Sequence, residues 1–170
     1  MEKGCVLALS GKTLEAIQMI TSGITTYRST GSRVYLPFFL AHLSRAHAEL
    51  GQFDDAWRCI GEAITAVETT NERWYEPEIN RIKGEIALKL PQLGSVQAGA
   101  YFERALTVAR TQQAKSWELR AAMNMARLWR DQGKPQQARD LLAPVYGWFT
   151  EGFDTSDLKE AKALLDTLAV

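Results

Sequence analysis

The sequence repeats itself with a period of about forty residues. No other feature constrains the fold as strongly, because the units of such an array must stack on their neighbours to bury a core. Small residues mark the period at two positions of each unit, and successive members of a series lie 40 or 42 residues apart. One series is Gly4, Ser44, Gly84 and Ala126, and the other is Ala16, Ala56, Ala98 and Ala138. The period therefore predicts about four similar units.

Each unit has a turn signal between its two small residues, with helical periodicity on both sides. Before the turn at Gly51, for example, Leu40, Leu43, His47 and Leu50 recur at steps of three and four residues, which is the spacing of one helix face. We therefore predict antiparallel helix pairs and one last helix. The predicted ranges are 2–10 with 13–29, 33–50 with 53–70, 74–90 with 95–112, 116–132 with 135–149, and 155–168 alone.

The small residues have a physical reason for their positions. Two helices approach closely only where the facing side chains are short, so each Gly or Ala pair marks a predicted contact within a helix hairpin. A single hairpin cannot bury its apolar face, and neighbours must stack into a solenoid. The predicted fold is all-α: a right-handed α-α superhelix of about four hairpins plus a C-terminal capping helix. We expect one repeat domain over residues 1–170, with units 1–31, 32–71, 72–114 and 115–150 and the cap at 155–168.

This arrangement of small residues and turn glycines resembles the tetratricopeptide repeat (TPR), whose usual period is 34 residues. A period near 40 is similar to the longer variant found in bacterial signalling ATPases of the maltose-regulator type. The C-terminal stretch, from Leu141-Leu142-Ala143-Pro144 through Gly152-Phe153-Asp154-Thr155, resembles the tail of bacterial proteins that join a cyclase or winged-helix domain, an ATPase and helical repeats. The resemblance implies a regulatory or scaffolding role. It leaves open whether the chain is a fragment of such a protein or the product of a free-standing gene.

Charge and cysteine content narrow the classes of function. Twenty Lys and Arg balance twenty Asp and Glu, whereas a general nucleic-acid binder normally carries a basic excess. Cys5 and Cys59 form no metal or redox motif, and the N-terminus has no export signal with a long apolar core. No apolar run approaches the length of a membrane helix. We expect a cytoplasmic protein that binds neither nucleic acid nor membrane directly.

No catalytic or cofactor site can be assembled from the sequence. Ser10-Gly11-Lys12-Thr13 is similar to the end of a phosphate-binding loop, but Val6 stands where that motif requires a glycine. His42 and His47 point about 140° apart on one helix, too far to share a metal. We therefore expect no enzyme activity, no metal and no cofactor. Most of the five tryptophans recur at unit starts or in apolar stripes, so core packing is their predicted role, with Trp148 beneath the capping helix.

The groove is the candidate binding site, because the first helix of each pair lines the concave face of such a solenoid. Asn124 lies near the position of a carboxylate-clamp asparagine in peptide-binding relatives, but Glu85 stands where a second one is expected, so we assign no clamp. The predicted groove residues are Phe38, Arg45, Glu78, Arg81, Glu85, Arg120, Met123, Asn124, Arg127 and Arg130. Two occupants stay open, a protein or peptide partner and a small-molecule effector. A merely solvated charged face is the alternative to both.

The two ends of the array are expected to behave differently. The last helix alternates Leu158, Ala161 and Leu164 with charged residues, as a cap with a polar outer side requires. The first helix is short, and we expect Leu14, Ile17, Ile20 and Ile24 of its partner to present more apolar surface than it can cover. Such surfaces are association sites. The sequence therefore predicts a two-fold homodimer through the N-terminal helix pair.

Overall fold

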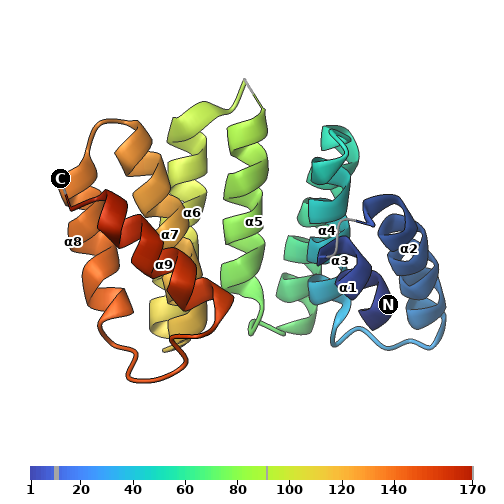
Figure 1. The fold of residues 1–170 in the computed structure, drawn as a ribbon. Helices are drawn as coiled ribbons and strands as arrows, with labels where there is room; N and C mark the ends of the chain where they lie inside the picture. The colour runs from blue at the N-terminus through green and yellow to red at the C-terminus, as the bar shows by residue number, and fades with distance from the viewer. Residues whose placement is uncertain (10–11, 91, 170) are drawn as a thin grey trace.

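The computed structural model describes residues 1–9, 12–90 and 92–169. Over these residues the chain forms nine helices and no strand, which confirms the all-α solenoid (Figure 1). The helices are α1 (Glu2–Leu9), α2 (Thr13–Ser29), α3 (Leu36–Glu49), α4 (Phe53–Thr70), α5 (Glu76–Lys89), α6 (Gly94–Thr111), α7 (Lys115–Asp131), α8 (Pro135–Tyr146) and α9 (Ser156–Thr167). Consecutive helices pack on one another as hairpins, and the hairpins stack side by side.

Prolines set the starts of three helices. Helices α3, α5 and α8 each carry a proline in their first two positions, namely Pro37, Pro77 and Pro135. A proline is tolerated there because the first N–H groups of a helix have no intrahelical partner. Because proline is tolerated only in the first turn of a helix, α3 and α5 cannot begin as early as residues 33 and 74; they begin at Leu36 and Glu76, slightly later than the periodicity predicts.

The small residues lie at the predicted contacts inside the hairpins. In the second unit the buried Ser44 hydroxyl donates a hydrogen bond of 2.6 Å to the Ala56 carbonyl oxygen. In the third unit a Cβ atom added to Gly84 would lie 2.4 Å from Cε1 of Phe102, a fully buried ring on α6. The ring thus fills the place that any side chain at position 84 would need.

Two hydrophobic cores are joined through α5. Ile79, Ile82 and Ile86 of this helix belong to the core formed with α1–α4. Ala87, which follows Ile86 on the same helix, belongs to the core that α6–α9 build around Phe102. Helix α5 is therefore a wall shared by both halves of the array.

The first hairpin covers its apolar face better than the sequence suggests. Ile20 and Ile24 are buried, so the expectation that they are exposed is wrong. The reason is Gly4: a Cβ atom at this position would lie 2.8 Å from Cγ1 of Ile20, and its absence lets α1 pack close to α2. Ile17 is half-buried, and Leu14 stays 62% exposed. The predicted dimer surface is thus reduced mainly to Leu14.

The last helix is a cap, as predicted, but it has a second contact surface. Leu158, Ala161 and Leu164 are buried against the C-terminal core, and α9 crosses α7 and α8 (Figure 1). The sequence predicts that the charged residues of this helix lie on its outer side, in contact with water. Two of them, Asp157 and Glu160, instead line the concave face of the array. The cap therefore forms one end of the groove.

Two features of the sequence analysis fall partly outside the described residues. Ser10 and Gly11 of the segment similar to a phosphate-binding loop are not described, and neither is Pro91 of the third turn. None of the helices in the described parts of the chain is long and apolar enough to cross a membrane.

Candidate binding groove

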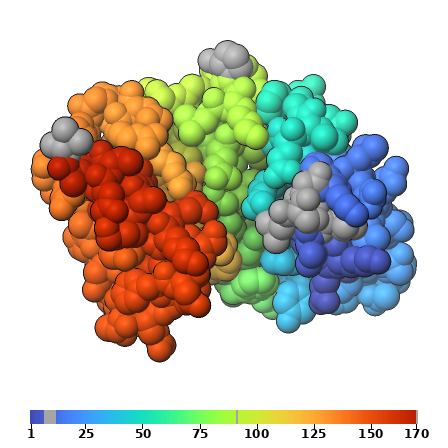
Figure 2. Space-filling model, in the orientation of Figure 1, coloured from blue at the N-terminus to red at the C-terminus, as the bar shows by residue number. Residues whose placement is uncertain are grey.

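A cavity of about 1070 Å³ occupies the concave face and is lined by side chains of α1, α3, α5, α7 and α9, together with Trp74 and Tyr75 just before α5. In the space-filling view the surface is hollowed between α9 on one side and the N-terminal helices on the other (Figure 2). Nine of the ten predicted groove residues line this cavity. They are Phe38, Arg45, Glu78, Arg81, Glu85, Arg120, Met123, Asn124 and Arg127.

Arg130 is not among the residues that line the cavity. Its side chain is 41% exposed and forms an ion pair of 2.9 Å with the adjacent Asp131. Arg120 and Arg127 are seven residues apart, close to two helical turns, and share a face; Arg130 is almost one further turn along, near the end of α7. The groove thus does not extend to Arg130, although helical spacing alone predicts that Arg130 belongs to it.

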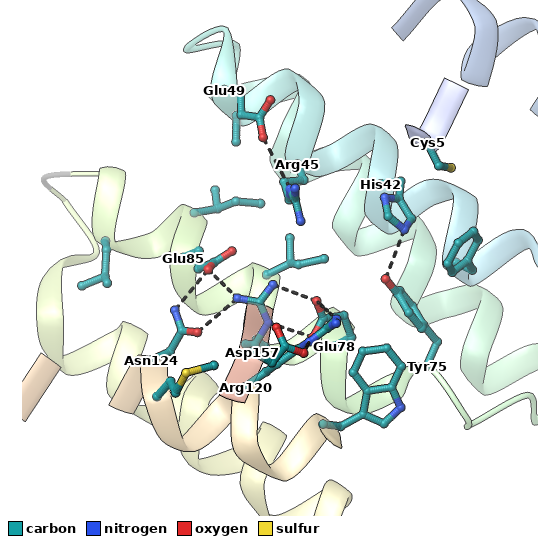
Figure 3. A pocket seen from close by; sticks show the side chains of 18 of the residues that line it. Cys5, His42, Arg45, Glu49, Tyr75, Glu78, Glu85, Arg120, Asn124 and Asp157 are labelled. Atoms are coloured by element: carbon teal, nitrogen blue, oxygen red, sulfur yellow. Dashed lines mark hydrogen bonds and ion pairs between the residues drawn. The ribbon is translucent and has the colours of Figure 1, made fainter. Parts of the chain in front are cut away.

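The centre of the groove is an ion-pair network around Arg81. The Arg81 guanidinium donates two hydrogen bonds of 2.8 Å to the two carboxylate oxygens of Glu78, three residues earlier on α5. It also donates to Glu85 and, at 3.1 Å, to Oδ1 of Asn124 on α7. Asn124 in turn donates through Nδ2 to Glu85 at 3.1 Å (Figure 3). The network satisfies these groups internally and ties α5 to α7.

Burial and pairing act in opposite directions on Arg81. Burial by itself lowers the pKa of a guanidinium, but the hydrogen bonds and charge of Glu78 and Glu85 outweigh this effect and raise the pKa of Arg81. Arg81 and Glu78 are both buried, so each depends on the other for its charge to be tolerated there. The pair is consequently a fixed part of the groove wall.

The two arginines of α7 that line the groove are paired with the capping helix. Nε of Arg120 lies 2.6 Å from Oδ2 of Asp157, and its Nη1 lies 3.8 Å from Glu78. Arg127 forms an ion pair of 3.1 Å with Glu160. Helix α9 thus supplies the carboxylates that neutralise Arg120 and Arg127.

Charges on the cavity wall are almost balanced. Within the described residues, the charged side chains of the lining are six carboxylates and five cations: Glu2, Glu49, Glu78, Glu85, Asp157 and Glu160, and Arg45, Arg81, Lys89, Arg120 and Arg127. Arg45 has a longer ion pair, 3.4 Å to Glu49 on its own helix. No buried side-chain nitrogen or oxygen in the described parts of the chain lacks a hydrogen-bond partner. The buried and half-buried charges at the centre of the groove are therefore compensated by one another.

Aromatic rings form the other wall, which we call the aromatic wall: Phe38, His42, Trp74, Tyr75 and Trp117. The Phe38 ring lies edge-on to Tyr75 with centroids 4.9 Å apart, and Tyr75 lies edge-on to Trp117 at 5.3 Å. Trp74 stacks beside Phe38 and is 41% exposed. The guanidinium of Arg120 lies 5.0 Å from the centre of the Trp117 ring, at the junction with the ion-pair network.

His42 is uncharged in this wall at neutral pH. Its Nε2 lies 3.3 Å from the Tyr75 hydroxyl oxygen (Figure 3). Burial lowers the pKa of His42 from 6.5 to about 4, and the positive charge of Arg45 adds to this. Burial also raises the pKa of the Tyr75 hydroxyl well above its usual value. Both groups are therefore neutral hydrogen-bonding groups.

Comparison with known proteins identifies the fold alone. No protein-family model matches the chain, and no curated protein matches it either. Two crystal structures of nearly identical TPR-like repeats from a putative kinesin light chain of Podosopora anserina, one of them carrying a single substitution, superpose with TM-scores of 0.70 and 0.69. They are 15% identical in sequence, and the match covers 98% of this chain and 82% of theirs. The fold is that of a TPR-like repeat.

Of the aromatic side of this groove, only Phe38 was predicted from the sequence. Trp74 lines the cavity and is well exposed, so its assignment to core packing is wrong, whereas Trp117 both packs against the N-terminal core and lines the cavity. Trp148 is 57% exposed, which also corrects its placement beneath the cap. A usable signal was present: Phe38 and His42 stand four residues apart on α3, the spacing that puts two side chains on one face.

Proposed function

We propose that this chain is a protein-interaction scaffold that docks an extended segment of a partner protein in its concave groove. The observation that carries this proposal is the extent of the cavity. It is lined by the first helix of all four hairpins and by the capping helix, and its volume slightly exceeds the ~300–1,000 Å³ usual for small-molecule sites. A site that crosses every unit suits an elongated ligand, for which successive helices supply successive contacts.

The proposal includes a non-catalytic role for residues 1–170 as one repeat domain. Cys5 lines the cavity, and burial raises the pKa of its thiol to about 11, so it is protonated and a poor nucleophile at neutral pH. Cys5 and Cys59 are both free thiols, which suits the reducing cytoplasm that we propose as the location. The resemblance of the C-terminal stretch to bacterial multidomain regulators supports a role in signalling or transcription control in such an organism.

A second candidate is the sensing of a small-molecule effector in the same groove. The aromatic wall favours it, because rings that line a concave surface can stack on a planar ligand. The two candidates differ in how much of the groove they need. A small effector would contact the aromatic wall alone, whereas an extended segment would also contact α9.

Site-specific photo-cross-linking in cells of the source organism tests the proposal. A cross-linking residue at Leu88, an exposed position that lines the cavity, is expected to capture a partner protein; the same residue at Val96, which is exposed but is not among the lining residues, is the control. A peptide from the captured protein should then bind in calorimetry. Arg45→Glu should weaken this binding, and Arg58→Glu, on the exposed side of α4, should leave it unchanged. Equal capture from Leu88 and Val96 would exclude a groove-bound partner.

A further inference from the structure

The aromatic wall and the ion-pair network occupy the same cavity but differ in what they leave available to a ligand. In the network, the buried charges already have partners: Glu78 has Arg81, and the half-buried Arg120 has Asp157. In the wall, Trp74 is well exposed and Phe38 and Trp117 are only half-buried. At the centre of the groove, the surface left available to a ligand is therefore apolar and aromatic.

A charged ligand group has no favourable place near the network. A carboxylate that approaches Arg120 must compete with Asp157 at 2.6 Å and also faces Glu78 at 3.8 Å from the same guanidinium. A cation that approaches Glu78 meets Arg81, which holds both of its carboxylate oxygens. Either ligand would break an existing pair and leave a charge without its partner in a partly buried site, which is the costly outcome.

The rings of the aromatic wall carry no net charge, and an aromatic face attracts a cation only weakly through its quadrupole. His42 is neutral at physiological pH and faces the Tyr75 hydroxyl. The nearby guanidinium of Arg120 already lies on the Trp117 face. An uncharged aromatic or branched apolar side chain can instead cover the exposed ring surfaces and pack edge-on or offset against them. Trp and Tyr are also the residues that dominate binding at such centres.

We propose that the groove selects a partner segment that places an uncharged aromatic or branched apolar side chain on the aromatic wall and buries no uncompensated charge. This inference rests on the proposed function, since it names the chemistry of the segment that docks there. An anionic group is not expected to pair with Arg120, Arg127 and Arg130, because the first two are held by α9 and the third is not among the lining residues. The charged network then acts by exclusion, as a wall that rejects segments with the wrong charge.

A display library of random twelve-residue peptides tests the selectivity. Peptides are selected on the wild-type protein and rejected if they also bind Trp74→Ala. We expect the enriched peptides to share an aromatic or branched apolar residue whose sequence neighbours carry no net charge. In a synthetic member, Asp or Lys in place of this residue should weaken binding by about tenfold or more. Trp148→Ala is the matched control, since Trp148 is exposed but is not among the lining residues, and it should change no affinity.

The outcomes separate this inference from the function on which it rests. Groove-dependent peptides that are consistently acidic or basic would overturn the selectivity and leave the docking function standing. A library without any groove-dependent peptide would overturn both. As a second measurement, N-acetyl-phenylalaninamide, phenylacetate and phenethylammonium are compared by NMR of the tryptophan indole N–H signals. The neutral probe should shift Trp74 and Trp117 at the lowest concentration, and tighter binding of either ion would contradict the proposal.

Discussion

Replacing Gly84 by alanine is expected to destabilise the protein although alanine is the better helix former. In the middle of a helix, glycine to alanine is worth about 1 kcal/mol in favour of alanine. At Gly84, however, the added methyl group would lie 2.4 Å from Cε1 and 2.6 Å from Cδ1 of Phe102. Carbon atoms pack best about 3.5–4.0 Å apart, so α5 and α6 must separate or the ring must leave its place.

The magnitude follows from comparing the two effects. Overpacking in a dense core costs roughly 1–3 kcal/mol, and the upper part of this range applies because Phe102 is fully buried. After subtraction of the helix-propensity gain, Gly84→Ala should lower the free energy of unfolding by about 2 kcal/mol. For a chain of this size, this corresponds to a decrease in melting temperature of about 4–8 °C. Gly84→Leu should be far more severe.

Gly61 on α4 provides the matched control, because a Cβ atom there meets nothing within 4 Å. Gly61→Ala should therefore stabilise the protein by up to about 1 kcal/mol. Urea unfolding followed by circular dichroism measures both variants. The double variant Gly84→Ala/Phe102→Leu should lose less stability than the sum of its single changes, since the smaller side chain makes room for the methyl group. If Gly84→Ala is as stable as Gly61→Ala, the close contact between α5 and α6 does not exist.

Three further predictions concern the groove and the N-terminal pair. Arg81→Ala should cost about 3–5 kcal/mol of unfolding free energy because it leaves Glu78 buried without its partner, whereas Arg58→Ala, in an exposed pair, should cost less than about 1 kcal/mol; equal losses in urea unfolding would refute the central role of Arg81. The pKa of His42 is 6.5 in the unfolded chain and about 4 in the folded chain. Protonation therefore favours the unfolded chain, and the free energy of unfolding should fall by about 2 kcal/mol as the pH drops from 7 to 5. His42→Gln should lose that part of the pH dependence, and an unchanged profile would show that the imidazole is not held neutral. Self-association through the first hairpin should give a light-scattering mass near twice 19.0 kDa, with Leu14→Glu as the folded monomeric variant; a monomer at millimolar concentration would refute it.

The period predicted most of the helices because it is a local property of the chain. Apolar spacing and turn residues place a helix, and the prolines at positions 37 and 77 correct its start by a few residues. Gly84 and Ser44 were identified as contact points for the same reason, since the physical requirement for a short side chain repeats with each unit.

The composition of the groove was harder to predict, because it depends on how elements far apart in sequence meet. On their own helix alone, Arg120 and Arg127 have the spacing of side chains open to an anionic ligand. Their partners, Asp157 and Glu160, stand on a helix whose crossing angle no periodicity encodes. Glu78 and Arg81 could have been paired from their spacing of three residues, but their burial depends on α7 packing against α5. For His42, the only indication in the sequence of a place in the groove is that it shares a helix face with Phe38.

Helix α5 has a consequence for how the array opens. Its isoleucines complete one core and Ala87 enters the other, so neither half keeps its apolar face covered once α5 unwinds. In a linear array, the ends normally fray while the interior survives, and the energy of each opening depends on the interfaces that it breaks. Backbone amides of α5 should therefore exchange their hydrogens with solvent only through the largest opening of the molecule. The amides of α1 and α9 should exchange through smaller and more frequent openings. The groove would then have its slowest-exchanging helix at the centre and its fastest-exchanging helices at the two ends. A bound segment that contacts all of these helices would therefore slow hydrogen exchange most in α1 and α9.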